Sequence, residues 1–274
     1  MSTRRSLLCT VFLACGWIAP LLPAAPTPQP WESTVSPYQP GSFPEPRPVK
    51  VQYIFGWNGF PAATATLRFS KADGRLRFEA TGETTGLARK LWDYQINHTA
   101  ISEAQTLRPL EVKEHESDRQ RQLTTELTFT PDDVTSQQEE RKGARVKTKT
   151  RHFDFPNVLS INSALLLLRT HPFPRGAVQR IVVYPATSAY LCTITSLGHE
   201  QITVPTGSYD AIKLDLQLSK IDKGRALQPH KKFKRATVWL SNDPDRLPLR
   251  IEAQIFIGTV FAELQSAQFE NGKP

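Results

Sequence analysis

The stretch Phe153-Asp-Phe-Pro-Asn-Val-Leu-Ser-Ile-Asn-Ser-Ala-Leu-Leu-Leu-Leu-Arg169 decides the fold, because it is the one long segment with a helical period of apolar residues. The residues that recur at steps of three and four are Val158, Ile161, Leu165 and Leu168. A helix that is apolar on nearly every side is normally buried. Asn157 or Ser160 can cap its start, and the prolines after residue 171 forbid its continuation. The pattern predicts a buried helix over residues 157–170.

Most of the remaining body has the two-residue period of β-strands. Val51, Tyr53 and Phe55 alternate with Lys50, Gln52 and Ile54. Two further segments up to residue 81 also alternate apolar and polar residues, as strands with one buried face do. Similar segments recur about every ten residues, as in all-β barrels and sandwiches. We therefore predict an all-β, mainly antiparallel curved sheet or incomplete β-barrel of about 12–14 strands, with a second, short helix over residues 84–92.

The N-terminus has the three parts of a secretory signal peptide. Met1-Ser-Thr-Arg-Arg5 is basic, Ser6 to Ile18 is an apolar run too short to span a bilayer, and small residues follow at 22–25. We expect residues 1–25 to be a signal peptide that exports a bacterial protein to the periplasm. A lipid anchor on Cys15, within a loose lipobox, is the less favoured alternative.

A proline-rich stretch divides the leader from the folded body. It contains eight prolines between residues 26 and 48, and such segments favour extended polyproline geometry rather than a packed sheet. The expected organisation is a leader (1–25), a linker (26–48), a single β-rich domain (49–269) and a short tail (270–274).

The cysteines and the charge restrict the class of protein. Two of the three cysteines, Cys9 and Cys15, lie in the leader, so Cys192 has no partner for an internal disulfide and is expected to be a small buried residue.

The formal net charge is +8. For an exported chain this charge excludes nucleic acid as the expected partner and favours an anionic membrane surface, lipopolysaccharide or simple solubility.

Aromatic and aliphatic residues form the first candidate site. We expect them to line a cavity for an apolar ligand, although such side chains more often form ordinary core. The candidate lining residues are Trp57, Phe60, Leu87, Leu91, Trp92, Leu165, Leu168, Trp239, Phe256 and Phe261.

Basic residues form the second candidate site. The segment from Lys220 to Arg235 is rich in lysine and arginine, and it is either a solvated loop or a contact for an anionic surface. The residues expected to make this contact are Lys231, Lys232, Lys234 and Arg235. Two other charged segments, acidic 111–116 and basic 145–151, are expected to pair across neighbouring strands.

No catalytic constellation is evident in the sequence. The six histidines are scattered without the four-residue spacing of a helical zinc site, and no nucleophile elbow, phosphate loop or dinucleotide fingerprint occurs. We therefore expect no enzymatic activity, no cofactor and no metal.

Several short motifs resemble a known family when taken in order. They are Val204-Pro-Thr-Gly-Ser-Tyr-Asp-Ala211, Val238-Trp-Leu-Ser-Asn-Asp243, Leu247-Pro-Leu-Arg-Ile251 and Gly258, preceded by Gly56, Gly86, Val158-Leu-Ser160 and Leu168-Arg169. This order resembles domain-of-unknown-function family 3108 (DUF3108), a group of exported bacterial proteins, over about residues 50–268. The resemblance implies no catalytic residues. The expected architecture is also similar to that of periplasmic lipoprotein carriers, in which an incomplete barrel encloses helices and an apolar cavity.

These observations favour a non-enzymatic envelope protein. The leading hypothesis is binding of a lipid or an acylated protein in a barrel-like cavity. The alternative is a structural or interaction protein with a filled core, and the third hypothesis is an enzyme acting on an envelope polymer. The sequence makes no prediction about the oligomeric state.

Overall fold

The computed structural model describes residues 28–41, 46–230 and 233–270, and its main feature is one antiparallel sheet of 15 strands. The strands are β1 (Val49–Trp57), β2 (Phe60–Ala72), β3 (Arg75–Thr84), β4 (Gln95–Glu103), β5 (Pro109–Ser117), β6 (Gln122–Phe129), β7 (Asp133–Lys142), β8 (Arg145–Asp154), β9 (Val178–Val183), β10 (Tyr190–Val204), β11 (Gly207–Ile221), β12 (Leu227–Pro229), β13 (Phe233–Ser241), β14 (Pro248–Ile255) and β15 (Gly258–Phe269). The helices are α1 (Gly86–Leu91), α2 (Ile161–Arg169) and the short 3-10 helix η1 (Glu32–Thr34).

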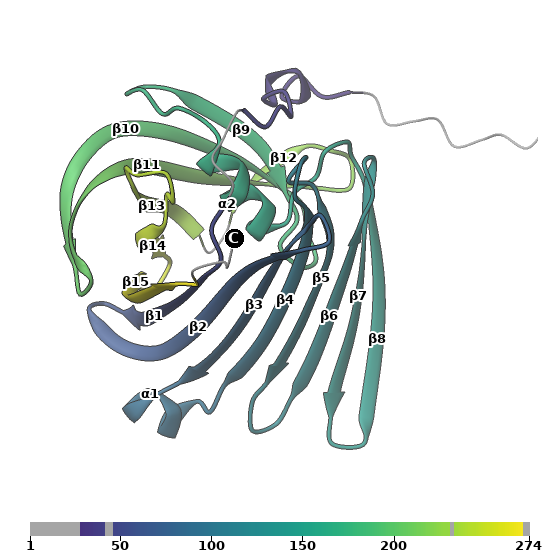
Figure 1. Cartoon of the computed structure of the whole chain (residues 1–274). Helices are drawn as coiled ribbons and strands as arrows, with labels where there is room; N and C mark the ends of the chain where they lie inside the picture. The colour runs from purple at the N-terminus through teal and green to yellow at the C-terminus, as the bar shows by residue number, and fades with distance from the viewer. Residues whose placement is uncertain (1–27, 42–45, 231–232, 271–274) are drawn as a thin grey trace, which may run out of the picture.

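The strand order confirms the predicted all-β class and the incomplete barrel. In the described chain the sheet runs β8-β7-β6-β5-β4-β3-β2-β1-β15-β14-β13-β11-β10-β9, with β12 beside β11, so β8 and β9 are its two edges. Strands β9 to β15 curve round with β1 and β2, whereas β3 to β8 fan out with their turns along one edge (Figure 1). The count of 15 strands is slightly above the predicted range.

Most neighbouring strands are also neighbours in sequence, because short turns connect antiparallel pairs. The main exception is the pairing of β1 with β15, in which Val49 lies opposite Phe269 and Trp57 lies opposite Val260. The predicted pairing of residues 111–116 with 145–151 is wrong. β5 pairs with β4 and β6, and β8 pairs with β7, so two strands lie between the acidic and the basic segment.

Helix α2 is shorter than the predicted 157–170 because the preceding residues bind to strand β9. Leu159 donates its backbone N–H to Val182 O (2.9 Å) and accepts one from Tyr184 N (2.9 Å), which holds it outside a helix. Asn157 has a positive φ of 56°. The helix then begins at Ile161, and the side chain of Ser160 caps it by accepting a hydrogen bond from Ser163 N (3.1 Å).

The predicted burial of this helix is confirmed. Leu167 and Leu168 pack with buried residues of β9, β10, β11 and β13, while Leu166 packs with residues of β1, β2 and β3. The helix therefore lies inside the curve of the sheet (Figure 1) and is held on two sides. A nine-residue helix is only marginally stable by itself. Full burial of one leucine contributes about 1.5–3 kcal/mol, so packing supplies most of the stability of α2.

Two sequence features have simple structural outcomes. Cys192 is buried in β10, as predicted, and burial raises the pKa of its thiol to about 12. None of the helices in the described ranges is long and apolar enough to span a bilayer.

Candidate functional site: an apolar pocket beside helix α2

An apolar pocket of about 80 Å³ lies between α2 and the concave face of the sheet. α2 contributes Leu165 and Leu166, and the opposing wall comes largely from β1, β2, β3 and β13. The apolar lining includes Val51, Tyr53, Leu67, Phe69, Phe78 and Leu240. Three arginines, Arg68, Arg169 and Arg246, also line it. An apolar wall with a few convergent polar groups is the usual form of a small-molecule site.

Hydrogen bonds from β4 fix the position of α2 beside this pocket, and β5 in turn holds His98 of β4. His98 Nε2 lies 3.0 Å from Asn162 Oδ1 in the first turn of the helix, and His98 Nδ1 lies 3.0 Å from Glu114 Oε2. Ser102 and Ser163 share a buried hydrogen bond of 2.8 Å between their hydroxyls. Burial alone would lower the pKa of His98, but its hydrogen bonds to Glu114 and Asn162 and the nearby Glu114 charge raise it.

The three arginines differ in how their charges are balanced. Arg68 is exposed and forms an ion pair with Glu270 (2.8 Å). Arg246 is half-buried and donates to His171 O (2.9 Å). Arg169 is also half-buried, and its guanidinium group has no hydrogen bond or ion pair within the part of the chain that the structure describes.

The electrostatic setting of Arg169 follows from this burial. Burial lowers its pKa, and the carboxylates of Asp245 and Asp243 act against that effect. These carboxylates have other bonds, since Asp245 pairs with Arg47 and Asp243 accepts from Ser241 Oγ (2.9 Å). The pocket therefore combines an apolar body with a guanidinium group that is available to an anion.

Small side chains continue the concave face from the pocket toward the turn between β1 and β2. Leu67 lines the pocket, and Ala65 and Ala63 follow it on the same face of β2 at two-residue steps. Gly82 of β3 pairs with Ala65, and a depression of about 240 Å³ has both residues in its lining. Most of the lining of that depression is polar and comes from β2, β3 and β4, for example Thr64, Thr81 and Gln95.

The structure separates the ten predicted cavity residues. Leu165 lines the pocket. Leu168 and Trp239 are buried in core clusters, and the indole N–H of Trp239 donates to Glu200. Phe261 lines a different cleft of about 660 Å³, together with charged residues such as Arg250 and Glu263.

The other six predicted cavity residues are exposed, so the expectation that they line an enclosed interior is wrong. Trp57, Phe60, Leu87, Leu91, Trp92 and Phe256 have exposed fractions between 46% (Trp57) and 86% (Leu91). They lie in or beside turns and in α1, which is shorter than the predicted 84–92 and buries no residue. The sequence shows that these residues are apolar, but it does not show whether another part of the protein covers them.

The predicted basic contact is only partly visible. Lys231 and Lys232 lie outside the described residues, as does the side chain of Lys234. Arg235 is described, and it forms an ion pair with the buried carboxylate of Asp215. Its charge is therefore already balanced within the protein.

Two basic segments noted in the sequence, 145–151 and the one that starts at Lys220, meet at a cleft where β8 approaches the end of β11. Its volume is about 640 Å³, and its lining includes five cationic residues, Lys149, Arg151, Lys220, Lys223 and Arg225, against two carboxylates, Asp154 and Asp222. These residues come from segments far apart in sequence, so no single charge run indicated the cleft.

Residues 28–41, 46–230 and 233–270 contain no group of three or more His, Cys, Asp or Glu side chains placed to hold a metal ion. The pocket-lining residues that the sequence analysis did not single out include Arg169 and Arg246. A charged residue at the end of an otherwise apolar helix, as in Leu168-Arg169, was the available signal.

Solved structures with a similar fold support the architecture. A β-barrel-like DUF1849 protein from Brucella abortus has a TM-score of 0.53 and 7% sequence identity, with 82% of this chain and 98% of that chain covered. At this identity the likeness shows the fold alone.

Two weaker likenesses carry no argument about function. A candidate lipoprotein from Parabacteroides distasonis has a TM-score of 0.33 and 9% identity, covering 82% of this chain and 97% of that chain. A candidate exported protein with a YmcC-like fold from Bacteroides fragilis has a TM-score of 0.35 and 8% identity, covering 82% and 98%.

Sequence comparison identifies the family but no characterised relative. No curated protein matches the chain in sequence. The family model described as "Protein of unknown function (DUF3108)" matches residues 52–265, which include most of the sheet and α2. The chain therefore belongs to the DUF3108 family.

Proposed function

We propose that this protein is an exported, non-enzymatic binding protein for an amphipathic ligand with an apolar chain and an anionic head group. The observation that carries the proposal is Arg169, a half-buried cation without a hydrogen-bond partner among the described residues, in the lining of an otherwise apolar pocket. The leader over residues 1–25 supports export to the periplasm.

The two parts of the pocket select the two parts of the ligand. Apolar side chains such as Val51, Leu67 and Phe78 favour a hydrocarbon chain, because its transfer from water is favourable. The guanidinium group of Arg169 favours a carboxylate or phosphate, which it can bind through two parallel hydrogen bonds. A lipid or an acylated molecule satisfies both requirements.

The size of the pocket restricts how much of the ligand it encloses. A cavity of about 150 Å³ binds a benzene molecule, and this pocket of about 80 Å³ is smaller. The pocket therefore holds the part of the chain next to the head group. The remaining chain leaves the pocket along β2 past Ala65 and Ala63, whose side chains are small.

The test compares ligands that share a chain and differ in charge. Laurate and dodecanol are titrated into lipid-free protein by calorimetry, with wild type, Arg169→Met and the exposed-site control Arg175→Met. We expect the wild type and the control to prefer laurate. Arg169→Met should bind laurate about 10- to 150-fold more weakly, because one charge-assisted hydrogen bond contributes about 1.5–3 kcal/mol. Dodecanol binding should be unchanged.

Protein purified from its own envelope provides the second measurement. Native mass spectrometry should show a bound amphipathic anion on the wild type and a much smaller amount on Arg169→Met. A wild type that carries no such molecule and binds neither laurate nor dodecanol would contradict the proposal. That result would favour the alternative of a structural protein with a filled core.

A further inference from the structure

Seven large apolar side chains are exposed at one end of the sheet, which we call the apolar end. They are Trp57, Phe60, Leu87, Leu91, Trp92, Phe256 and Ile257, with exposed fractions of 46, 74, 77, 86, 53, 59 and 53%. Single exposed apolar residues are common on proteins, but a group of this size marks an interaction surface.

Hydrogen bonds to backbone carbonyls bring the segments of the apolar end together. Trp57 at the end of β1 donates its indole N–H to Ile257 O (3.2 Å), which joins the β1–β2 turn to the β14–β15 turn. Thr85, just before α1, donates its N–H to Ala62 O (2.9 Å), which places α1 beside the start of β2. The apolar end is therefore one continuous feature at the sheet edge.

Helix α1 contributes to the apolar end without contributing to the core. It has six residues and none is buried, so no face of α1 packs on the sheet and both Leu87 and Leu91 face solvent. The next residue, Trp92, stacks near Tyr94 with ring centroids 4.5 Å apart. Leucine and tryptophan beside basic residues are typical of helices that lie in a membrane interface.

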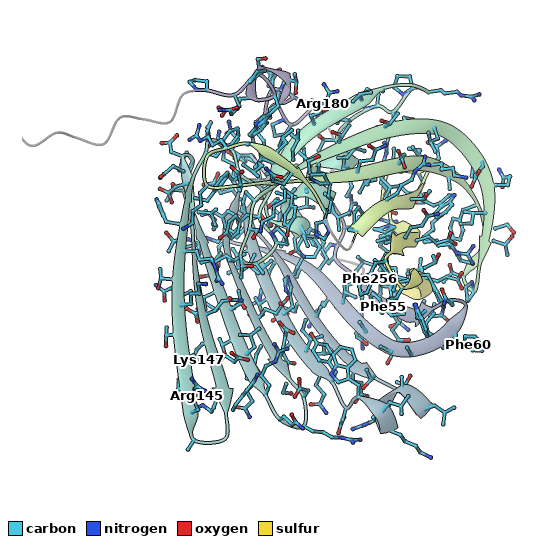
Figure 2. The ribbon with its side chains drawn as sticks, turned by 180° about the vertical axis from the view of Figure 1, so that it is seen from behind. Phe55, Phe60, Arg145, Lys147, Arg180 and Phe256 are labelled. Atoms are coloured by element: carbon cyan, nitrogen blue, oxygen red, sulfur yellow. The ribbon has the colours of Figure 1, made fainter. Side chains whose placement is uncertain are left out.

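Basic residues without ion pairs accompany the apolar end along the same edge. Lys90 on α1 is exposed, and so are Arg145 and Lys147 at the start of β8; none of the three has an ion-pair partner in the described chain. Figure 2 shows Arg145 and Lys147 near the lower tip of β8, Phe60 on the other side of the molecule and Phe256 higher on that side. Arg119 of the β5–β6 turn donates to Lys90 O (2.9 Å) and so links α1 to the neighbouring turns.

We propose that this edge of the sheet docks on an anionic lipid bilayer, with the apolar end inserted among the head groups and Lys90, Arg145 and Lys147 facing the lipid phosphates. Apolar side chains provide burial and the cations provide attraction to the negative surface. A second copy of the chain fits this edge poorly, because like charges at Lys90, Arg145 and Lys147 would then approach one another. The inference does not depend on the ligand proposed above.

The experiment measures co-sedimentation of the mature protein with vesicles, using protein whose mass excludes an attached lipid. The vesicles contain equal parts of phosphatidylglycerol and phosphatidylcholine, or phosphatidylcholine alone. The test variant is Phe60→Ser/Leu87→Ser/Leu91→Ser. The matched control, Ile161→Ser/Val178→Ser/Leu197→Ser, removes three exposed apolar side chains from other parts of the surface.

We expect the wild type and the control to sediment with the anionic vesicles and the test variant to lose most of this binding. Replacing Lys90, Arg145 and Lys147 with Gln should weaken binding about five-fold for each residue and remove the preference for anionic lipid. Added salt should weaken wild-type binding, because it screens exposed charge. Brominated lipids should quench the fluorescence of Trp57 and Trp92.

Two outcomes would overturn the inference. One is equal sedimentation of the wild type and the Phe60/Leu87/Leu91 variant. The other is a wild-type oligomer in solution that dissociates in this variant while vesicle binding is unchanged, which would make the apolar end a contact between protein chains. Either result leaves laurate binding by Arg169 untouched, so the two proposals fail separately.

Discussion

Replacing Arg169 with methionine should make the lipid-free protein more stable while it loses its ligand. A charged side chain that is partly removed from water costs free energy unless new hydrogen bonds replace its hydration, and Arg169 has none among the described residues. Replacing buried charges with apolar groups of similar volume often stabilises proteins by about 1–4 kcal/mol. Arg169 keeps some contact with solvent and is attracted by Asp243 and Asp245. We therefore expect the lower value, about 1 kcal/mol.

Urea unfolding of lipid-free protein measures this change. With a slope of about 2.5 kcal/mol/M, a gain of about 1 kcal/mol raises the midpoint by about 0.4 M at constant slope. Arg175→Met is the control, because Arg175 is exposed and its replacement should change the free energy of unfolding by less than about 0.5 kcal/mol. A decrease of about 1 kcal/mol in the free energy of unfolding of Arg169→Met would refute the reasoning, since it would show that Arg169 stabilises the ligand-free fold.

Three further measurements test the fold and its electrostatics. Leu166→Ala should lower the free energy of unfolding by about 2–5 kcal/mol, whereas Ile161→Ala on the exposed side of α2 should cost under about 1 kcal/mol; equal losses in urea unfolding would be inconsistent with this packing. Hydrogen bonds raise the folded-state pKa of His98, so the stability it contributes is complete below its unfolded pKa near 6.5 and is lost as pH rises through the folded value. His98→Gln should remove this pH dependence, measured as the unfolding midpoint against pH, and an unchanged profile would count against the Glu114 contact. Cys192, with a thiol pKa of about 12, should resist iodoacetamide in the folded protein and react only after unfolding, as followed by mass spectrometry; rapid labelling of the native state would show that the site opens.

The features that the sequence predicted correctly depend on local periodicity. Val51 and Tyr53 alternate with exposed neighbours because successive strand residues face opposite sides, and this period identifies β1 without knowledge of its partners. The run of leucines before Arg169 likewise identified a buried helix, because apolar side chains on most sides of a helix need cover, although Ile161 at its start stays exposed.

The features that the sequence did not predict depend on contacts between distant segments. Leu159 leaves the helix because it bonds to Val182 and Tyr184, and nothing in its own neighbourhood indicates that bridge. Leu87 and Leu91 are four residues apart, as on the apolar face of a helix, yet α1 does not bury either residue. The pocket exists only because β1, β2, β3 and β13 meet α2, so Arg169 could not be assigned to a site from its local sequence.

The pairing of β1 with β15 has a consequence for the order in which the sheet forms. The strands β1 to β8 and β9 to β15 form two meanders, and each is able to form locally because consecutive strands pair through turns. They join where Val49 meets Phe269, near opposite ends of the polypeptide. A chain that emerges from its N-terminus must therefore keep the free edge of β1 unpaired until the last strand is released. During that interval the free edge of β1 is open to pairing with other chains, as unpaired strand edges generally are.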